Sequence, residues 1–471
     1  MKRFPELWSV DVRSLAAFRI ASGGLVLLDL FQRSMDMKAF YTDQGVFPRL
    51  ALLSSWADPW RFSLLLASGS LLAAWGWWAW SCACAFCWMV GYKTHLAGFL
   101  TWLLWLSWQW RAPLMLHGGD ALLLLMIFWC LFLPVEALWS MDAARPRSGA
   151  FRTAADGPPL VFHAGTVALL AQVIIMYECT AFFKARWVGW TNGDAIYFAL
   201  NSDFWTTATG RWLFHYPWLF KPLSRMILWY EWIGPLLLFS PWATAVLRLL
   251  AIVGFCVFQA SIGASLCMGL FPVIGMAAMI PFLPGVFWDR LGFRVDAVEE
   301  APVPVSAGKT AGVFFLFGLM IWFNLWTLMP RLPFPAPLYN ACRMLAFDHR
   351  WNLFSDPAGY DGWLVVAGRL RNGTTIDLLE PKRSLDWTRP AVATQRFPST
   401  RWEIYLWSYT YNLRPDLRSY VPAFYCGEWN AAHPGEDHLE ETTVYFMRRN
   451  VFPRFNTVPP EKITLATLRC N

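Results

Sequence analysis

Charged residues are scarce in this chain. Asp, Glu, Lys and Arg make up 15% of its 471 residues, whereas they make up about 25% of an average soluble domain. Hydrophobic residues account for 56% of the chain, and the mean hydropathy is +0.36. This balance excludes an ordinary water-soluble globular protein and indicates a lipid bilayer as the solvent. The 31 tryptophans agree with that assignment, because tryptophan favours the membrane–water interface.

The sequence also lacks the signature motifs of common enzyme classes. It contains no G-x-S-x-G, Walker, Rossmann or H-E-x-x-H pattern, and no internal repeat. The net charge of +7 comes from Lys and Arg in short loops and in the C-terminal part, without a dense run. Such charges are typical of membrane topology rather than of nucleic-acid binding. We therefore expect the lipid bilayer as a partner and no nucleic acid.

The ten cysteines do not form a disulfide framework. Cys426 and Cys470 lie in the C-terminal part and could pair if that part faces an oxidising compartment. The cluster Cys82-x-Cys84-x-x-Cys87 has no second cluster to complete a metal site, and free cysteine is a common apolar packing residue. We predict no metal. Cysteines in apolar segments are Cys82, Cys84, Cys87, Cys130, Cys179, Cys256 and Cys267.

Apolar segments that meet or approach the length of a membrane helix, about 20 residues, recur along residues 12–331. They predict an all-α polytopic helical bundle of about nine spans, within a membrane domain at 1–334. No small-residue cleavage site follows the first segment, so we interpret it as a span rather than a signal peptide. The segments are 12–32, 62–91, 95–110, 118–137, 161–183, 226–242, 245–264, 266–286 and 311–331.

Basic residues in the loops suggest an orientation. With the N-terminus in the cytoplasm, the turn at Lys93, the loop 138–160 with Arg145, Arg147 and Arg152, and the loop 289–309 all fall inside, as the positive-inside rule requires. The loop 33–61, with four basic residues, falls outside and runs against the rule. An odd number of spans leaves residues 335–471 outside the cytoplasm.

Residues 335–471 differ in character and predict an extramembrane β-containing domain, here called the tail domain. Two strand-like runs flank Asn372-Gly373, a strong hairpin turn signal. Val444–Arg449 and Ile463–Arg469 predict further strands, and Arg401–Tyr409 predicts a short helix. The proline-rich stretch 330–337 is the expected linker.

Ionisable residues within apolar segments are costly and are candidate functional sites. Asp29 and Arg33 are four residues apart and can pair on one helix face. With Arg19 on the same predicted span, we interpret this group as a structural ion pair. Glu178 and Glu231 also lie in predicted spans.

Lys184 ends an apolar run near the expected outer face. It is either a lysine that anchors the span by reaching to the interface or a buried amine that serves as a general base. His117 precedes the fourth span on the same side, followed by Asp120. It is either a solvated loop histidine or a partner of Lys184 in proton transfer.

Five stretches, taken in order, resemble the HTTM family, which includes the vitamin K-dependent γ-glutamyl carboxylases. The resemblance covers roughly residues 8–290, and it lies in the order and spacing of the stretches rather than in any one motif. Arg350-Trp-Asn-Leu-Phe-Ser resembles the start of the outer domain in bacterial members. The five stretches are residues 10–20; Tyr41-Thr-Asp-Gln-Gly-Val-Phe-Pro; Gly91-Tyr-Lys-Thr with His117-Gly-Gly-Asp and Trp139-Ser-Met-Asp; Tyr177–Lys184 with Trp187; and 258–271.

The resemblance implies a chemistry and a location. Lys184 would deprotonate reduced vitamin K or another quinol, assisted by His117. Oxygen would convert the quinol to a strong base that removes a γ-proton from a glutamate. The resulting glutamate carbanion would take up carbon dioxide, and the quinol would leave as its epoxide. Such an enzyme combines a lyase and an epoxidase activity. Gln259, Trp187, Tyr177 and Asp120 would contribute to substrate or cofactor binding. A bacterial inner membrane is implied.

Departures from the carboxylase pattern keep other hypotheses open. An asparagine pair is replaced by Met115 and Leu116, a histidine is replaced by Gln259, and the tail domain is much shorter than the carboxylase's outer region. A second hypothesis is therefore a non-enzymatic maturation or scaffold factor whose tail domain binds a secreted peptide or protein client. A third is a quinone-binding redox partner without base chemistry.

Overall fold

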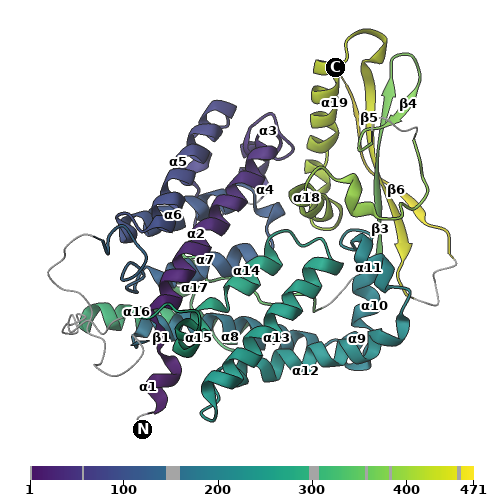
Figure 1. Ribbon diagram of the computed structural model, residues 1–471. Helices are drawn as coiled ribbons and strands as arrows, with labels where there is room; N and C mark the ends of the chain where they lie inside the picture. The colour runs from purple at the N-terminus through teal and green to yellow at the C-terminus, as the bar shows by residue number, and fades with distance from the viewer. Residues whose placement is uncertain are drawn as a thin grey trace.

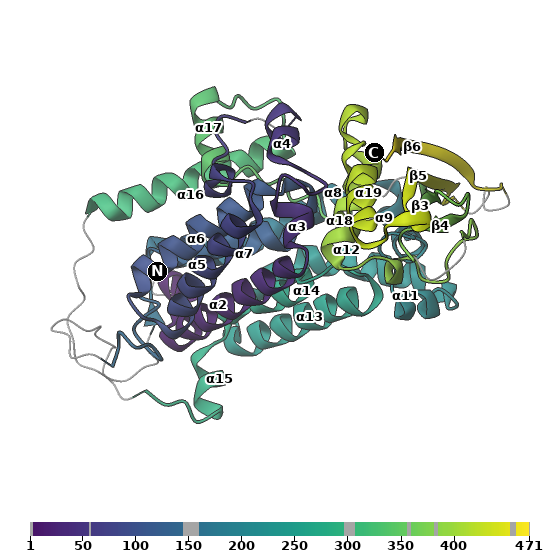
Figure 2. The same cartoon turned by 90° about the horizontal axis from the view of Figure 1, so that it is seen from above.

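The computed structural model describes residues 3–55, 58–144, 160–295, 307–355, 359–380, 385–452 and 458–470. Helices fill most of the chain up to residue 344, and a sheet with further helices follows (Figures 1 and 2). Arg145, Arg147 and Arg152, of the predicted cytoplasmic loop, lie outside the described residues. A two-residue ribbon, β1 (Val10–Asp11) paired with β2 (Leu160–Val161), joins the start of the first long helix to the segment before α8.

The long helices of the bundle pack side by side. Helix α2 packs on α5 and α5 on α6, while α8 packs on α7, α12 and α16, and α12 packs on α13. The bounds are α1 (Arg3–Trp8), α2 (Val12–Met35), α3 (Met37–Tyr41), α4 (Arg49–Ser55), α5 (Leu71–Val90), α6 (Thr94–Arg111), α7 (Gly118–Cys130), α8 (Ala164–Ala185), α9 (Val188–Asn192), α10 (Ala195–Leu200), α11 (Ala208–Leu213), α12 (Phe220–Leu238), α13 (Thr244–Ser265), α14 (Phe271–Ala277), α15 (Gly285–Arg290), α16 (Ala307–Leu328) and α17 (Ala336–Met344).

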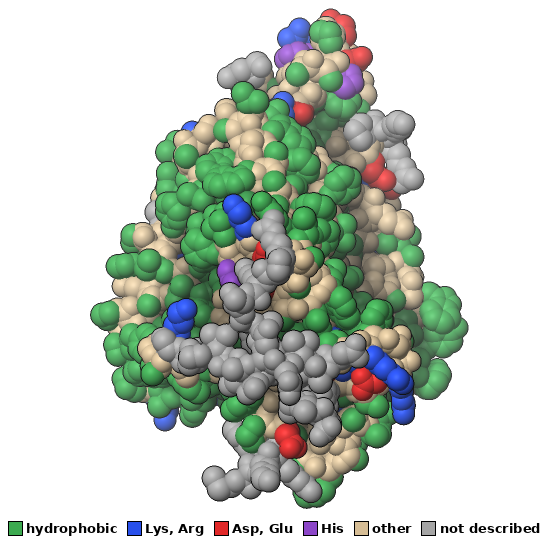
Figure 3. Space-filling view, turned by 60° about the vertical axis from the view of Figure 1, so that its left-hand side comes forward, with side chains coloured by type: hydrophobic (Ala, Val, Ile, Leu, Met, Phe, Trp, Pro, Cys, Tyr) green, Lys and Arg blue, Asp and Glu red, His purple; other side chains and the backbone are tan. Residues whose placement is uncertain are grey.

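Four helices of the described chain are long and apolar enough to cross a membrane: α2, α8, α13 and α16. The outward faces of α13 and of its neighbour α12 also indicate a lipid environment, because large apolar side chains are exposed there at helical spacing, which water does not favour. Figure 3 shows one such face, largely hydrophobic, with charged side chains in scattered spots. The exposed residues include Met226, Trp229, Ile233 and Leu236 on α12, and Val246, Leu250, Val253 and Val257 on α13.

Several predicted spans are shorter in the structure. The segment 266–286 contains the seven residues of α14, a 3₁₀ turn at Ile280–Phe282 and the first two residues of α15, because Pro272, Pro281 and Pro284 interrupt a longer helix. Helix α7 ends at Cys130, four residues before Pro134. Within 62–91, a 3₁₀ turn at Leu64–Ala67 precedes α5, which begins at Leu71.

The tail domain contains an antiparallel sheet of order β4-β3-β5-β6. Gly373, with φ of +84°, occupies the turn between β3 and β4, so the predicted hairpin is confirmed. The two other predicted strands lie within β5 and β6. The bounds are β3 (Tyr360–Leu370), β4 (Thr375–Asp377), β5 (Leu439–Asn450) and β6 (Glu461–Arg469).

Two helices connect this sheet to the bundle. Helix α18 (Thr400–Tyr411) contains the predicted 401–409 helix and contacts the turn at Pro113–Met115, before α7. Helix α19 (Tyr420–Ala432), which was not predicted, packs on β5. A disulfide between Cys426 and Cys470 joins α19 to the end of β6, with 5.6 Å between the two Cα atoms. The tail domain is therefore fixed both internally and against the bundle (Figure 1).

Candidate functional site

Lys184 is fully buried near the C-terminal end of α8 and binds one carboxylate. Its Nζ donates to Glu231 Oε1 at 2.6 Å and to Oε2 at 2.8 Å. Lys184 is 1% exposed and Glu231 2% exposed. The pair forms because α8 and α12 pack side by side. A buried amine with one buried carboxylate is a self-contained proton donor–acceptor pair, and a lysine that merely anchors a span to the interface would instead extend into water.

Aromatic rings surround the rest of the amine. Lys184 Nζ lies 4.6 Å from the ring centre of Trp190, 5.9 Å from that of Phe258 and 6.0 Å from that of Phe354. Trp190 is held in place by a bond from its Nε1 to the Phe354 carbonyl, at 2.8 Å. Aromatic faces attract a cation and exclude water. The shell therefore shields from bulk water the proton that Lys184 shares with Glu231.

Tyr177 and Gln259 form a second polar pair beside Lys184. Tyr177 lies two turns before Lys184 on α8, and its hydroxyl accepts a hydrogen bond from Gln259 Nε2 of α13 at 3.0 Å. Gln259 is 1% exposed, and its Oε1 has no hydrogen-bond partner among the described residues. A buried carbonyl oxygen without a donor is costly, so this atom can accept a hydrogen bond from a bound hydroxyl or N–H.

The space between these two pairs is small. We call it the Lys184 cavity. The region in which the centre of a water molecule fits measures about 10 Å³, which is room for roughly one water. Ligand pockets usually measure about 300–1,000 Å³. Leu353 and Phe354, from the segment before the tail sheet, form part of its wall. Phe354 adopts φ of +53°, a conformation that costs a bulky residue energy. In this conformation the cavity does not fit a quinol head group.

His117 lies outside the Lys184 cavity. It caps the N-terminus of α7: its ring Nδ1 accepts from the Asp120 backbone N–H at 3.3 Å, and its backbone N–H donates to Asp120 Oδ2 at 2.9 Å. Its ring lies edge-on to Phe271, with 6.3 Å between ring centres, and Phe271 in turn lines the cavity. His117 Nε2 is buried without a partner among the described residues. One aromatic ring thus separates the predicted histidine from the cavity.

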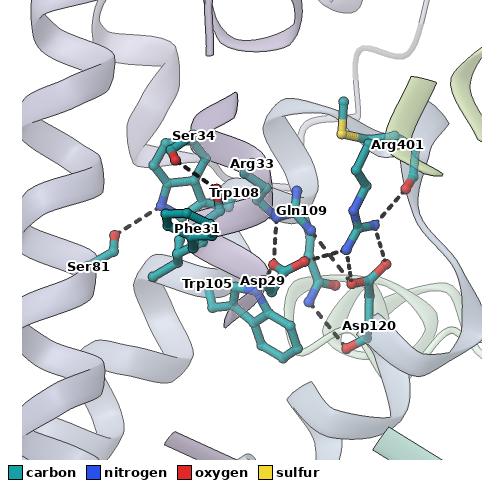
Figure 4. A network of polar contacts seen from close by, with 12 residues as sticks. Asp29, Phe31, Arg33, Ser34, Ser81, Trp105, Trp108, Gln109, Asp120 and Arg401 are labelled. Carbon is teal, nitrogen blue, oxygen red and sulfur yellow. Dashed lines mark hydrogen bonds and ion pairs between the residues drawn. The ribbon is translucent and has the colours of Figure 1, made fainter. Parts of the chain in front are cut away.

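Asp120 belongs to a different site, shown in Figure 4 and called here the Arg401 cluster: Asp29, Arg33, Asp120 and Arg401. Arg401 of the tail domain forms two parallel bonds of 2.9 Å to Asp120, and it also binds Asp29. Arg33 binds Asp29 at 2.6 Å, as predicted from their spacing. Two carboxylates and two guanidinium groups balance each other in a buried position, so the cluster is a clamp between α2, α7 and the tail domain.

Other predicted residues occupy supporting positions. Trp187 packs on Phe198, with ring centres 5.3 Å apart, and Trp190 rather than Trp187 lies over the Lys184 amine. Arg19 donates to the Trp88 and Trp139 carbonyls and is not part of the Asp29 pair. Sequence reasoning singled out Glu231 but did not pair it with Lys184. The two are 47 residues apart, and only the packing of α8 on α12 joins them.

The described residues contain no group of three or more His, Cys, Asp or Glu side chains that could hold a metal ion. Cys426 and Cys470, for which pairing was left open, form a disulfide. The candidate site in the described part of the chain is therefore the buried Lys184–Glu231 pair.

Comparisons of this chain with protein families, curated proteins and solved structures find no match.

Proposed function

We propose that this chain is a membrane-embedded enzyme of the HTTM family in which Lys184 takes a proton from a lipid-soluble quinol. The observation that carries the proposal is the Lys184–Glu231 pair, buried in an aromatic shell beside the free Gln259 carbonyl oxygen. The family resemblance supplies the substrate class. A quinol brings a weakly acidic hydroxyl and, with oxygen, the oxidation chemistry that the side chains themselves lack.

Lys184 acts as a base only after it loses its own proton. Glu231 is the acceptor within reach, since 2.6 Å separates Nζ from Oε1. Transfer along this bond converts the ion pair to a neutral amine and a neutral carboxylic acid without separating charge in an apolar site. The neutral amine can then accept a hydroxyl proton, while Gln259 Oε1 can orient a second donor. Both groups stay shielded from bulk water.

Access requires Leu353 and Phe354 to move, because the closed cavity holds roughly one water. The backbone of Phe354 lies in the left-handed region. For a bulky residue this conformation costs about 1–3 kcal/mol of conformational free energy, which is recovered when the residue moves to an ordinary conformation. We propose that this segment opens toward the outer leaflet. Replacing either side chain with alanine should increase the rate of quinol entry.

The membrane arrangement is part of the proposal. About nine segments cross the bilayer, the N-terminus faces the cytoplasm of a bacterial cell, and the tail domain faces outward. The Cys426–Cys470 disulfide supports an outward tail domain, because such bonds persist in oxidising compartments. Lys184 then lies toward the outer face.

The test is quinol turnover by the purified protein in detergent. Reduced vitamin K or menaquinol is added with oxygen, with and without a glutamate peptide, and the epoxide is measured by chromatography. Wild type and the exposed-lysine control Lys221→Ala should form epoxide, whereas Lys184→Ala should not. Glu231→Gln should lose most of the rate, because the proton has no acceptor. Equal turnover by Lys184→Ala and wild type would contradict the base assignment.

A second function is favoured by the small volume of the Lys184 cavity. The tail domain has a larger pocket of about 420 Å³, lined by Trp363, Arg389 and Arg449 among others. A closed bundle with such a pocket suits a non-enzymatic maturation or scaffold factor for a secreted peptide or protein client. This candidate predicts no epoxide from any variant, and a client whose co-purification needs the tail domain but not Lys184.

A further inference from the structure

A second, larger pocket lies where β3, β5 and the segment 387–389 meet the segment after α10. It is called here the tail pocket, and the region in which a water-sized sphere fits is about 420 Å³, within the range of small-ligand sites. Its charged lining residues are both arginines, Arg389 and Arg449. The other main walls are Asn201, Phe214, Trp363 and Trp387.

The positive charge at this pocket is not balanced. Asp203 is fully buried and binds three guanidinium groups, which we call the Asp203 cluster: Asp203, Arg211, Arg389 and Arg449. Arg389 Nε lies 2.9 Å from Oδ1, and Arg449 Nε lies 2.6 Å from Oδ2; Arg211 also binds Oδ1. One carboxylate cannot neutralise three guanidinium groups, so positive charge remains for a ligand at the two arginines that line the pocket.

A neighbouring acid does little to restore the balance. Asp361 accepts a hydrogen bond from the Asp203 backbone N–H at 2.7 Å and bonds from the Gly362 backbone and the Tyr411 hydroxyl. Burial and the adjacent charge of Asp203 raise the pKa of Asp361, and its hydrogen bonds go to these donors rather than to the arginines of the Asp203 cluster. The side chain of Arg389 remains 38% exposed, within reach of a ligand.

Trp363 gives an independent sign of a ligand. Its side chain lines the tail pocket and is only 3% exposed, yet its Nε1 has no hydrogen-bond partner among the described residues. A buried indole N–H normally finds an acceptor. Beside it, Trp387 packs edge-on to Tyr445 with ring centres 5.2 Å apart, and Lys462 Nζ lies 3.4 Å from the Trp387 ring centre. The pocket thus combines aromatic walls, one free N–H donor and excess positive charge.

We propose that the tail pocket binds an organic carboxylate that carries an aromatic or aliphatic group and a carbonyl, as an acidic peptide segment does. The carboxylate bonds to Arg389 and Arg449, whose planar donors match its geometry. The ligand carbonyl accepts the Trp363 N–H, and the apolar group packs against Trp387 and Phe214. The inference concerns a site apart from Lys184 and holds whether or not the quinol chemistry occurs.

The probe is hippurate, which joins a benzoyl ring, an amide carbonyl and a carboxylate. Isothermal titration calorimetry on the full chain in detergent should show saturable binding. Hippuramide, which lacks the charge, should bind at least about tenfold more weakly, and Arg389→Met should weaken hippurate binding by about tenfold or more. Arg389→Lys keeps the charge but loses the planar fork and should fall between the two. Trp363→Phe should weaken hippurate by roughly three- to tenfold.

Arg414→Met is the matched control, since Arg414 forms only an exposed pair with Asp416; its affinity should equal that of wild type. Melting temperature confirms that each variant is folded. Absence of saturable binding to wild type up to roughly 10 mM hippurate, equal affinity for hippuramide, or unchanged affinity in folded Arg389→Met would each overturn the proposal.

Discussion

Buried charge is neutralised differently in the two parts of this molecule. In the bundle, Lys184 meets one glutamate, and the Arg401 cluster sets two arginines against two aspartates. Beside the tail pocket, one aspartate faces three arginines. Lipid and packed side chains provide no solvent for an unmatched ion, so in these two sites each charge meets an opposite charge, whereas the buried Arg19 and Arg111 donate to backbone carbonyls instead. The tail pocket is open to water and tolerates an excess. The excess therefore identifies the place where a charged ligand can complete the balance.

The largest expected effect comes from breaking the Arg401 cluster. Arg401→Met leaves Asp29 and Asp120 with Arg33 as their remaining partner in the cluster, so the free energy of unfolding should fall by about 3–5 kcal/mol. Equilibrium unfolding in detergent measures the loss. The matched control is Arg414→Met on the surface, which should cost under about 1 kcal/mol. Equal losses from the two variants would show that the clamp is not a major stabilising contact.

Variants of the Lys184–Glu231 pair test whether stability depends on the presence of the two charges or only on their neutralising each other. Lys184→Met should reduce the free energy of unfolding by about 3 kcal/mol, because Glu231 is left alone. The double variant Lys184→Met/Glu231→Leu removes both charges and should recover most of that loss, while remaining inactive. A double variant less stable than the single one would mean that the ion pair is itself stabilising.

Glu403 offers an unmatched carboxyl on the same helix as Arg401. It is 1% exposed, its Oε1 has no partner among the described residues, and burial raises its pKa from 4.5 to about 9. The stability that this group contributes is fully present below its unfolded pKa of 4.5 and is lost as pH rises toward the folded pKa. Glu403→Gln should therefore be more stable than wild type near pH 7.5, by at most about 4 kcal/mol, because roughly 1.4 kcal/mol is lost for each pH unit above 4.5.

The pH profile of the difference is the decisive measurement for Glu403. Melting temperatures of wild type and Glu403→Gln should coincide near pH 4.5 and diverge steadily toward pH 9. A difference that does not change with pH would instead indicate a change in packing.

The smallest effect is expected at the Asp203 cluster. Arg389→Met leaves Asp203 with Arg211 and Arg449, so the free energy of unfolding should change by under about 1 kcal/mol. Thermal unfolding of Arg389→Met and Arg401→Met, measured side by side, compares the cluster with excess positive charge with the cluster whose charges balance. A loss as large as that of Arg401→Met would mean that the third arginine is structurally required, and the distinction between the two parts would fail.

Local patterns in the sequence predicted much of the fold. Hydrophobic runs located the long helices, Asn372-Gly373 located the hairpin, and four-residue spacing located the Asp29–Arg33 pair. These features depend on neighbours along the chain. The predicted span at 266–286 was wrong in length, because its prolines break the helix that its hydropathy suggests.

The candidate site was predictable only in part. Lys184, Tyr177 and Gln259 do line one cavity, whereas His117 lies beyond Phe271 and Asp120 belongs to the Arg401 cluster. Arg401 itself was passed over, since its partners Asp120 and Asp29 lie 281 and 372 residues earlier in the chain. Contacts over such separations depend on how helices pack, which hydropathy and spacing do not encode.

The Arg401 cluster also sets an order in time. Arg401 follows Asp120 by 281 residues, and at about 5–20 residues per second a ribosome needs roughly 15 to 55 s to reach it. Asp29 already has Arg33 one helical turn away, but Asp120 must wait for its main partner until the bundle has been synthesised. A nascent chain interrupted before residue 401 would therefore carry an uncompensated acid inside its helices, a chemical mark by which quality control could distinguish it from a finished chain.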